Sequence, residues 1–255
     1  MKKINLGLKI GSKDVQFTDE ILKYYEQGVF QYIELFTLSE TFNDTISYWR
    51  QFKIPFGIHA PHSAAGLNLV DISNRKSNQR KITEVIKFAD ELKARYIIFH
   101  SGTDGIKEEV VYQLKPFADE RFLIENKPIR GITCGTSVGC TYEELKFIID
   151  EIGNGCGFCL DFGHAICAAN TLKIYPYEFI NELKKLSPKV FHLTDGDYNS
   201  EKDSHFHYGS GTFPLKHLLD FTCDECMITN EAKRINADSL DEFYEDAKYL
   251  RNIVL

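Results

Sequence analysis

Residues 82–100, ITEVIKFADELKARYIIFH, contain the features of a helix followed by those of a strand. Apolar residues recur every three or four positions, the period of one face of an α-helix, at Ile82, Val85, Ile86, Ala89 and Leu92. Tyr96–His100 is a short run of β-branched and aromatic residues, which is typical of a buried strand. This stretch therefore predicts one unit of a protein in which helices and strands alternate.

The same alternation recurs along the whole chain. Eight β-rich runs are separated by longer helical segments, and they lie at Ile4–Leu8, Tyr32–Leu35, Phe56–His59, Tyr96–His100, Arg121–Glu125, Gly157–Asp161, Val190–Leu193 and Met227–Asn230. Thr141–Glu144 predicts an N-cap with a capping-box glutamate that opens a helix through Ile149, and Ser239–Leu250 predicts a closing amphipathic helix. Eight strand–helix units in about 250 residues predict an α/β fold, a (β/α)₈ TIM barrel forming a single domain over residues 1–255. A doubly wound sheet is the alternative, but no GxGxxG motif follows the first strand.

Composition narrows the class of protein. The 255 residues are 43% hydrophobic and 26% charged, which is ordinary globular usage. No stretch approaches the ~20 apolar residues of a membrane span, and no apolar run behind Lys2 and Lys3 suggests a signal peptide. Seven cysteines, an odd number, without a secretory signal predict reduced thiols and a cytoplasmic location. The net charge of −7 argues against a protein that coats nucleic acid, but it is compatible with an enzyme that contacts nucleic acid locally.

Histidines and carboxylates follow the predicted strands at their C-terminal ends, where a TIM barrel builds its active site. Seven of the eight histidines, all except His217, lie at or just beyond such an end: His59, His62, His100, His164, His192, His205 and His207. Glu125, Asp161 and Glu231 close the fifth, sixth and eighth strands, and Asp203 lies beside His205 in the loop after the seventh. Imidazoles and carboxylates are ligands of Zn²⁺ or Mn²⁺, and so many of them suit a cluster of two or three ions.

These motifs resemble those of the endonuclease IV family, apurinic/apyrimidinic endonucleases within the xylose-isomerase-like barrel superfamily. The resemblance extends from about Pro61 to Glu231. It lies in Pro61–Leu69 (PHSAAGLNL), Phe99–Gly102, Ile124–Asn126, Asp161–Ala165, His192–Asp195, Asp203–His205 with Gly209–Gly211, and Glu231. It implies a zinc-dependent hydrolase of DNA repair that cuts DNA 5′ to abasic sites.

The resemblance also implies a ligand set for up to three zinc ions. The first ion would be held by His62, His100 and Glu125, the second by Glu125, Asp161, His192 and Glu231, and the third by His164, Asp203 and His205. Glu125 would bridge two ions and poise the attacking water for in-line attack, while Glu231 would orient or deprotonate that water. His59 and His207 have no counterpart in the family, and we expect supporting or structural roles for them.

Several positions depart from the family pattern. Thr41 and Ala65 stand where the endonucleases carry an arginine and a tyrosine that wedge into the DNA stack, and Lys9 stands where the family has a histidine. Tyr32–Leu35 instead resembles the sugar isomerase and epimerase branch of the superfamily. That branch holds a single metal with Glu, Asp, His and Glu, a set that Glu125, Asp161, His192 and Glu231 also satisfy.

Two enzyme hypotheses follow. The first is a phosphodiesterase of the endonuclease IV type; the second is a metal-dependent sugar (phosphate) isomerase or epimerase, in which Glu125 and Glu231 shuttle a proton. An isomerase has no need of His62, His100 and the Asp203/His205 pair as ligands, so these residues favour the phosphodiesterase. A degenerate barrel acting as a binding module is disfavoured by the intact ligand set. The sequence leaves open the substrate (abasic DNA or a small phosphorylated or sugar molecule), the choice of Zn²⁺ or Mn²⁺, and the oligomeric state.

Overall fold

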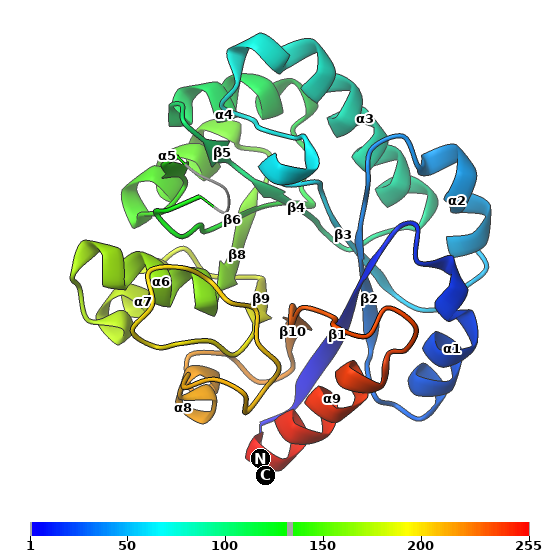
Figure 1. Ribbon diagram of the computed structural model, residues 1–255. Helices are drawn as coiled ribbons and strands as arrows, with labels where there is room; N and C mark the ends of the chain where they lie inside the picture. The colour runs from blue at the N-terminus through cyan, green and yellow to red at the C-terminus, as the bar shows by residue number, and fades with distance from the viewer. Residues whose placement is uncertain (1, 132–134, 255) are drawn as a thin grey trace.

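A computed structural model describes residues 2–131 and 135–254 of the chain. Its centre is a closed barrel of parallel strands in the order β1-β10-β9-β8-β6-β4-β3-β2 (Figure 1). The strands are β1 (Ile4–Gly11), β2 (Tyr32–Phe36), β3 (Phe56–His59), β4 (Ile97–His100), β6 (Phe122–Glu125), β8 (Gly157–Asp161), β9 (Val190–Leu193) and β10 (Cys226–Asn230). The pairing of β1 with β10, which begins at Ile4 opposite Cys226, closes the barrel. The predicted (β/α)₈ barrel is confirmed.

Helices form an outer ring around the strands (Figure 1). They are α1 (Thr18–Glu26), α2 (Phe42–Trp49), α3 (Arg75–Glu91), α4 (Lys107–Leu114), α5 (Tyr142–Ile152), α6 (Phe162–Leu172), α7 (Pro176–Lys184), α8 (Leu215–Leu219) and α9 (Asp241–Val254). Short 3₁₀ turns lie at Val15–Phe17, Ser63–Ala65, Ile72–Asn74 and Lys115–Phe117, and two short strands, β5 (Gly102–Thr103) and β7 (Ser137–Val138), pair antiparallel outside the barrel. α3 buries Ile82, Val85 and Ala89, which belong to the predicted apolar face.

A local signal accounts for the start of α5. The hydroxyl of Thr141 caps α5 by accepting from the backbone N–H of Glu144 at 3.4 Å. The carboxylate of Glu144 accepts instead from the N–H groups of Gly139 and Cys140, at 3.1 and 3.0 Å, so the reciprocal half of the predicted capping box is shifted to the loop before the helix. The closing helix α9 begins two residues later and ends four residues later than the predicted range Ser239–Leu250.

The lower interior of the barrel is an apolar layer made by Tyr32, Tyr96, Ile98, Leu123, Cys159 and Val190. The rings of Tyr32 and Tyr96 pack edge to face, with centroids 6.3 Å apart. Each ring lies over a glycine, because a Cβ on Gly7 would collide with the ring of Tyr32 and a Cβ on Gly57 with the ring of Tyr96. This layer fills the barrel below the site and leaves its upper end for polar side chains.

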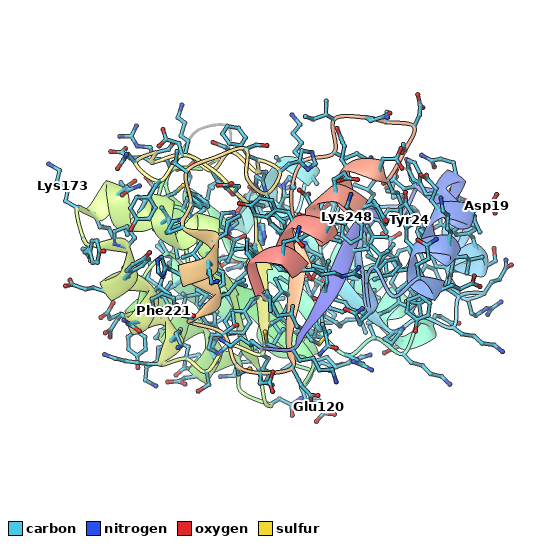
Figure 2. The ribbon with its side chains drawn as sticks, turned by 90° about the horizontal axis from the view of Figure 1, so that it is seen from below. Asp19, Tyr24, Glu120, Lys173, Phe221 and Lys248 are labelled. Atoms are coloured by element: carbon cyan, nitrogen blue, oxygen red, sulfur yellow. The ribbon has the colours of Figure 1, made fainter. Side chains whose placement is uncertain are left out.

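The two ends of the barrel differ in what they carry. Figure 2 shows Glu120, which precedes β6, at the lower edge, and the loops that follow β9 and β10 at the opposite edge. The C-terminal ends of the strands therefore open toward those two loops. No helix in the described ranges 2–131 and 135–254 is long and apolar enough to span a membrane.

Candidate metal centre

Above the apolar layer, the inner face of the barrel carries a second layer of carboxylates and imidazoles. It consists of Glu34, His59, His100, Glu125, Asp161 and His192, each on a strand, and Glu231 just after β10. None of these residues is more than 9% exposed. Side chains two positions apart on a strand share a face, so Glu34 lies above Tyr32, His100 above Ile98, and His192 above Val190. The period of two along each strand explains why the sequence could locate this layer.

The ligand atoms in and around this layer converge in several groups. In the part of the chain that the structure describes, five groups have one ligand atom per residue, all within 4.8 Å of one another. They are Glu125/Asp161/His192/Glu231, His164/Asp203/His205, His59/His100/Glu125, Glu34/His59/His192/Glu231 and Glu125/Cys159/His192. The first two contain the residues expected for the second and third ions. The third differs from the expected first group in one residue, since His59 stands where His62 was expected.

His62 lies beside these groups and belongs to none of them among the described residues. Its ring stacks on the rings of Phe36 and His100, with centroids 5.4 and 6.0 Å apart. Burial lowers the pKa of His62 to about 4. The spacing to Asn68 favoured His62, but His59 is the last residue of β3 and faces inward, whereas His62 follows in the loop.

Hydrogen bonds fix the orientation of the imidazoles. In three of them Nδ1 donates to a backbone carbonyl: His59 to Ala60 (2.7 Å), His164 to Asn126 (2.9 Å) and His205 to Glu231 (3.0 Å). Because a carbonyl can only accept, Nδ1 carries the proton, and in the neutral ring Nε2 is left free as a ligand atom. These Nε2 atoms face carboxylates: that of His59 lies 3.2 Å from Glu125, and those of His164 and His205 lie 3.4 and 2.9 Å from Asp203. Such orientation by the second ring nitrogen is usual for histidines that bind metal.

His192 is oriented in the opposite sense. Its Nε2 lies 3.1 Å from Oε2 of Glu34, so its Nδ1 faces Glu231 at 2.8 Å and Glu125 at 3.4 Å. Despite these distances, Nδ1 has no partner with hydrogen-bond geometry in the described ranges, nor has Oε1 of Glu125 or Oδ2 of Asp203. His192 and Glu125 belong to one of the groups of ligand atoms and Asp203 belongs to another, so these unpaired atoms are available as metal ligands. The donor set and its unpaired atoms therefore fit divalent metal.

Charges in this layer compensate one another. Burial alone raises the pKa of Glu125, but the charges of His100 and His192 hold that pKa well below its usual range. Burial raises the pKa of Asp161 to about 6. Although burial lowers it, the adjacent carboxylate of Asp203 raises the pKa of His205 to about 9. The carboxylates thus attract positive charge, which protons supply here and which divalent ions would supply more compactly.

The loop between β9 and α8 carries Asp203 and His205 and is held at several points. The carboxylate of Asp195 accepts four backbone N–H groups, from Gly196 and Phe213 on Oδ1 and from Gly209 and Gly211 on Oδ2, at 2.8–3.0 Å. Nδ1 of His207 lies 2.8 Å from Asp246 on α9. His207 therefore ties the loop to a helix, in agreement with the structural role expected for it.

The structure shows the contacts of two residues, Thr41 and Lys9, that differ from the family pattern. Thr41 is 1% exposed, and its hydroxyl donates to the carbonyl of Leu38 at 2.7 Å, so it presents no surface to a large substrate. Lys9 extends from β1 into the polar layer, where its ammonium forms ion pairs with Glu231 and, at 3.7 Å, with Glu34. Sequence reasoning assigned no role to Lys9 or Glu34, because only strand pairing brings them together: they are register partners on β1 and β2.

A family model described as xylose isomerase-like TIM barrel matches residues 30–253 of the chain. A protein named probable endonuclease 4 from Thermoplasma volcanium is 29% identical over 164 residues, which cover 59% of this chain and 57% of that protein. Another probable endonuclease 4, from Aquifex aeolicus, is 28% identical over 243 residues, which cover 81% of this chain and 83% of that protein. The match to the Thermoplasma protein thus spans little more than half of that relative's length.

Solved structures of two different enzyme types share the architecture. Endonuclease IV from Thermus thermophilus superposes with a TM-score of 0.72 at 19% identity, covering 98% of each chain. A D-tagatose 3-epimerase-like protein also gives a TM-score of 0.72, at 21% identity, covering 100% of this chain and 97% of that one. At such identities these likenesses show the fold alone.

Proposed function

This chain belongs to the xylose isomerase-like TIM barrel family, whose model spans residues 30–253, and within that family we propose that it is a metal-dependent phosphodiesterase. We propose further that it hydrolyses DNA 5′ to abasic sites with up to three zinc ions. The observation that carries the proposal is the group of His164, Asp203 and His205. It lies beside the group that a single-metal isomerase would use, and such an isomerase would not need these three residues as ligands.

In this proposal three groups hold the metal: Glu125/Asp161/His192/Glu231, His164/Asp203/His205 and His59/His100/Glu125, with His59 in place of His62. Glu125 belongs to two of them, which suits a carboxylate shared between ions. Divalent ions in such groups supply Lewis acidity toward a phosphate and lower the pKa of a bound water. Asp203 holds His205 through a contact of 2.9 Å, and Glu34 holds His192, so these ligands need little rearrangement.

Glu231 is the residue that we assign to proton transfer from the attacking water. It lies at the C-terminal end of β10, is 9% exposed, and contacts Nδ1 of His192 at 2.8 Å. Burial raises its pKa, but the charges of His192 and Lys9 outweigh burial and hold that pKa well below its usual range. The carboxylate is therefore ionised and able to accept a hydrogen bond from water.

A sugar isomerase or epimerase is the second candidate, because Glu125, Asp161, His192 and Glu231 form a complete single-metal group by themselves. Glu125 and Glu231 would then move a proton next to a carbonyl of the substrate. Glu34 is 0% exposed and lies 3.1 Å from His192 of this group, and it matches that branch of the superfamily in the sequence.

Metal content and cleavage distinguish the two candidates. The first measurement is the number of ions per chain in protein purified without chelator, with about three expected for the phosphodiesterase and about one for the isomerase. The second is cleavage of a labelled abasic oligonucleotide, duplex and single-stranded, with Zn²⁺ or Mn²⁺ and with a chelator control. Fully metallated protein that cleaves neither form would contradict the DNA assignment and favour a small sugar or phosphorylated substrate.

We expect the single-stranded substrate to be cleaved better than the duplex. Thr41 is buried and Ala65 is short, so neither can offset the few kcal/mol that unstacking a nucleotide costs. The net charge of −7 also gives no general attraction to phosphate. Efficient cleavage of duplex at physiological salt would mean that other residues act as the wedge.

A further inference from the structure

One of the five groups contains a positive charge of the protein itself. Glu34, His59, His192 and Glu231 offer ligand atoms within 4.8 Å of one another, and all four residues are buried. The ammonium of Lys9 forms ion pairs with both carboxylates of this group, Glu231 and Glu34. Lys9 therefore lies where a cation bound by the group would be attracted.

The carboxylate of Glu34 has one oxygen already bonded and one not. Oε2 accepts from the hydroxyls of Tyr96 at 2.7 Å and Thr229 at 2.8 Å and faces Nε2 of His192 at 3.1 Å. Oε1 is fully buried and has no hydrogen-bond partner among the described residues; the ammonium of Lys9 lies 3.7 Å from it. A buried anionic oxygen without a donor is costly, and a cation held nearby offsets that cost.

The position of Lys9 is determined by the barrel. It is paired in register with Glu34 on the neighbouring strand, and its ammonium lies 5.8 Å from the ring centroid of Phe36. Only 20% of its side chain is exposed. If this charge withdrew to solvent, Glu34 and Glu231 would lose one neighbouring cation and would rely on the imidazole of His192, which lies 3.1 and 2.8 Å from them.

We propose that the ammonium of Lys9 is the resident cation of the Glu34/His59/His192/Glu231 group and keeps divalent metal out of it. A neutral side chain at position 9 leaves the carboxylates of Glu34 and Glu231 able to hold a further Zn²⁺ or Mn²⁺, because the ligand nitrogens of His59 and His192 already serve the neighbouring groups. The inference rests on the proposed metal binding, since His59, His192 and Glu231 are shared with the neighbouring groups.

Metal content of variants tests the inference. Lys9→Met keeps the length of the side chain without its charge, and Lys9→Arg keeps the charge as a matched control. After loading with Zn²⁺ and removal of free metal, we expect Lys9→Met to hold one more ion per chain than the wild type by inductively coupled plasma mass spectrometry, and Lys9→Arg to hold the wild-type number. The double variant Lys9→Met/Glu34→Gln should hold the same number of ions as Glu34→Gln alone.

The outcomes separate this inference from the proposed function. No additional ion in Lys9→Met, or an additional ion that persists without the charge of Glu34, overturns the inference. A wild type that binds no ion while Lys9→Met binds one overturns the proposed function and supports the inference. If Lys9→Met does not fold, Lys9→Gln replaces it in the same comparison.

Thermal unfolding gives a readout that does not depend on counting ions. In excess chelator, Lys9→Met removes one of the cations beside two buried carboxylates, so we expect its melting temperature to fall below that of the wild type. Zn²⁺ restores it, whereas Lys9→Arg needs no metal to remain near the wild-type value. A Lys9→Met protein that is as stable in chelator as the wild type would contradict the assignment.

Discussion

Two layers of side chains line the same barrel, one step of the strand period apart, and they have opposite properties. The lower layer, which includes Tyr32, Tyr96 and Ile98, is apolar and packs without charge. The upper layer, which includes Glu34, His100 and Glu125, is buried but charged. The same strands carry both layers, so residues two positions apart on one inner face have different roles: the lower ones pack the barrel, and the upper ones form the proposed metal centre.

The boundary between the layers is made by hydroxyl groups. The phenol of Tyr96 donates to Glu34 at 2.7 Å, and the phenol of Tyr32 lies 2.8 Å from the hydroxyl of Thr229, which itself donates to Glu34. The lower layer thus presents its few polar atoms upward, toward the charge it must support. Substitutions in one layer at a time measure how far the two layers depend on each other.

The largest effect is expected from Glu125→Gln in the upper layer. Glu125 contributes to more than one ligand group, so its loss should remove two ions and reduce activity by at least about a hundredfold. The measurements are metal content and cleavage of the abasic oligonucleotide. A variant that keeps all its ions would mean that Glu125 is not shared between metals.

His164→Ala and His205→Ala are expected to remove one ion each and most of the activity. Their group lies at the rim, whereas barrel stability comes mainly from the packed interior, so the melting temperature of the metal-free protein should change little. His217→Ala is the matched control, because His217 lies on α8 with a side chain that is 71% exposed. Full metal content and full turnover in both rim variants would exclude the group as a metal site.

Gly57→Ala should have the reverse effect, since it acts on the lower layer. Its Cβ would collide with Cζ of the buried Tyr96, and such overpacking costs about 1–3 kcal/mol of unfolding free energy. Urea denaturation measures the loss, and Gly11→Ala, where the nearest atom is the side-chain oxygen of Asp14 at 3.1 Å, is the control. We expect the folded fraction of Gly57→Ala to bind the wild-type number of ions; fewer ions would show that the layers are coupled.

Glu34→Gln acts at the boundary and should have a moderate effect. The carboxylate that holds Nε2 of His192 is replaced by a neutral amide, and losing such a supporting partner typically weakens metal binding by about 10–100-fold. Competition with a fluorescent zinc chelator measures the affinity. An unchanged affinity would mean that the orientation of His192 does not depend on Glu34.

The smallest effect is expected from His62→Ala. His62 stacks on His100 but contributes to no ligand group in the described part of the chain, so metal content should stay at the wild-type value. His59→Ala, three residues earlier, should lose one ion. If the two results are exchanged, the ligand set implied by the family motif holds and the strand-end residue is the supporting one.

Most of the fold and much of the site followed from the sequence because both depend on local order. Gly157–Asp161 and Val190–Leu193 were predicted with the bounds that the structure has, since each is a short apolar run between turn signals. Asp161 and His192 end the inner face of these strands, so a prediction of the strand ends also located these two candidate ligands.

The features that could not be predicted from the sequence depend on which residues are close together in space. His59 and His62 lie on either side of a strand end, and the spacing to Asn68 cannot reveal which ring turns inward. The pairing of Lys9 with Glu34 depends on the register of β1 against β2, for which the sequence carries no local signal. The placement of Glu144 against Gly139 likewise depends on the path of the loop before α5.

The four backbone hydrogen bonds of Asp195 have a consequence for how fast metal can be captured. They join the start of the loop after β9 to Gly209 and Gly211, so the segment that carries Asp203 and His205 is closed into a ring by the protein alone. Ordering a free backbone costs about 1–2 kcal/mol per residue, and here that cost is met during folding rather than when an ion arrives. In the proposed metal centre, Asp203 and His205 would therefore be in place before an ion arrives, and we expect the rate of capture to be set by diffusion and loss of hydration water instead of by loop closure.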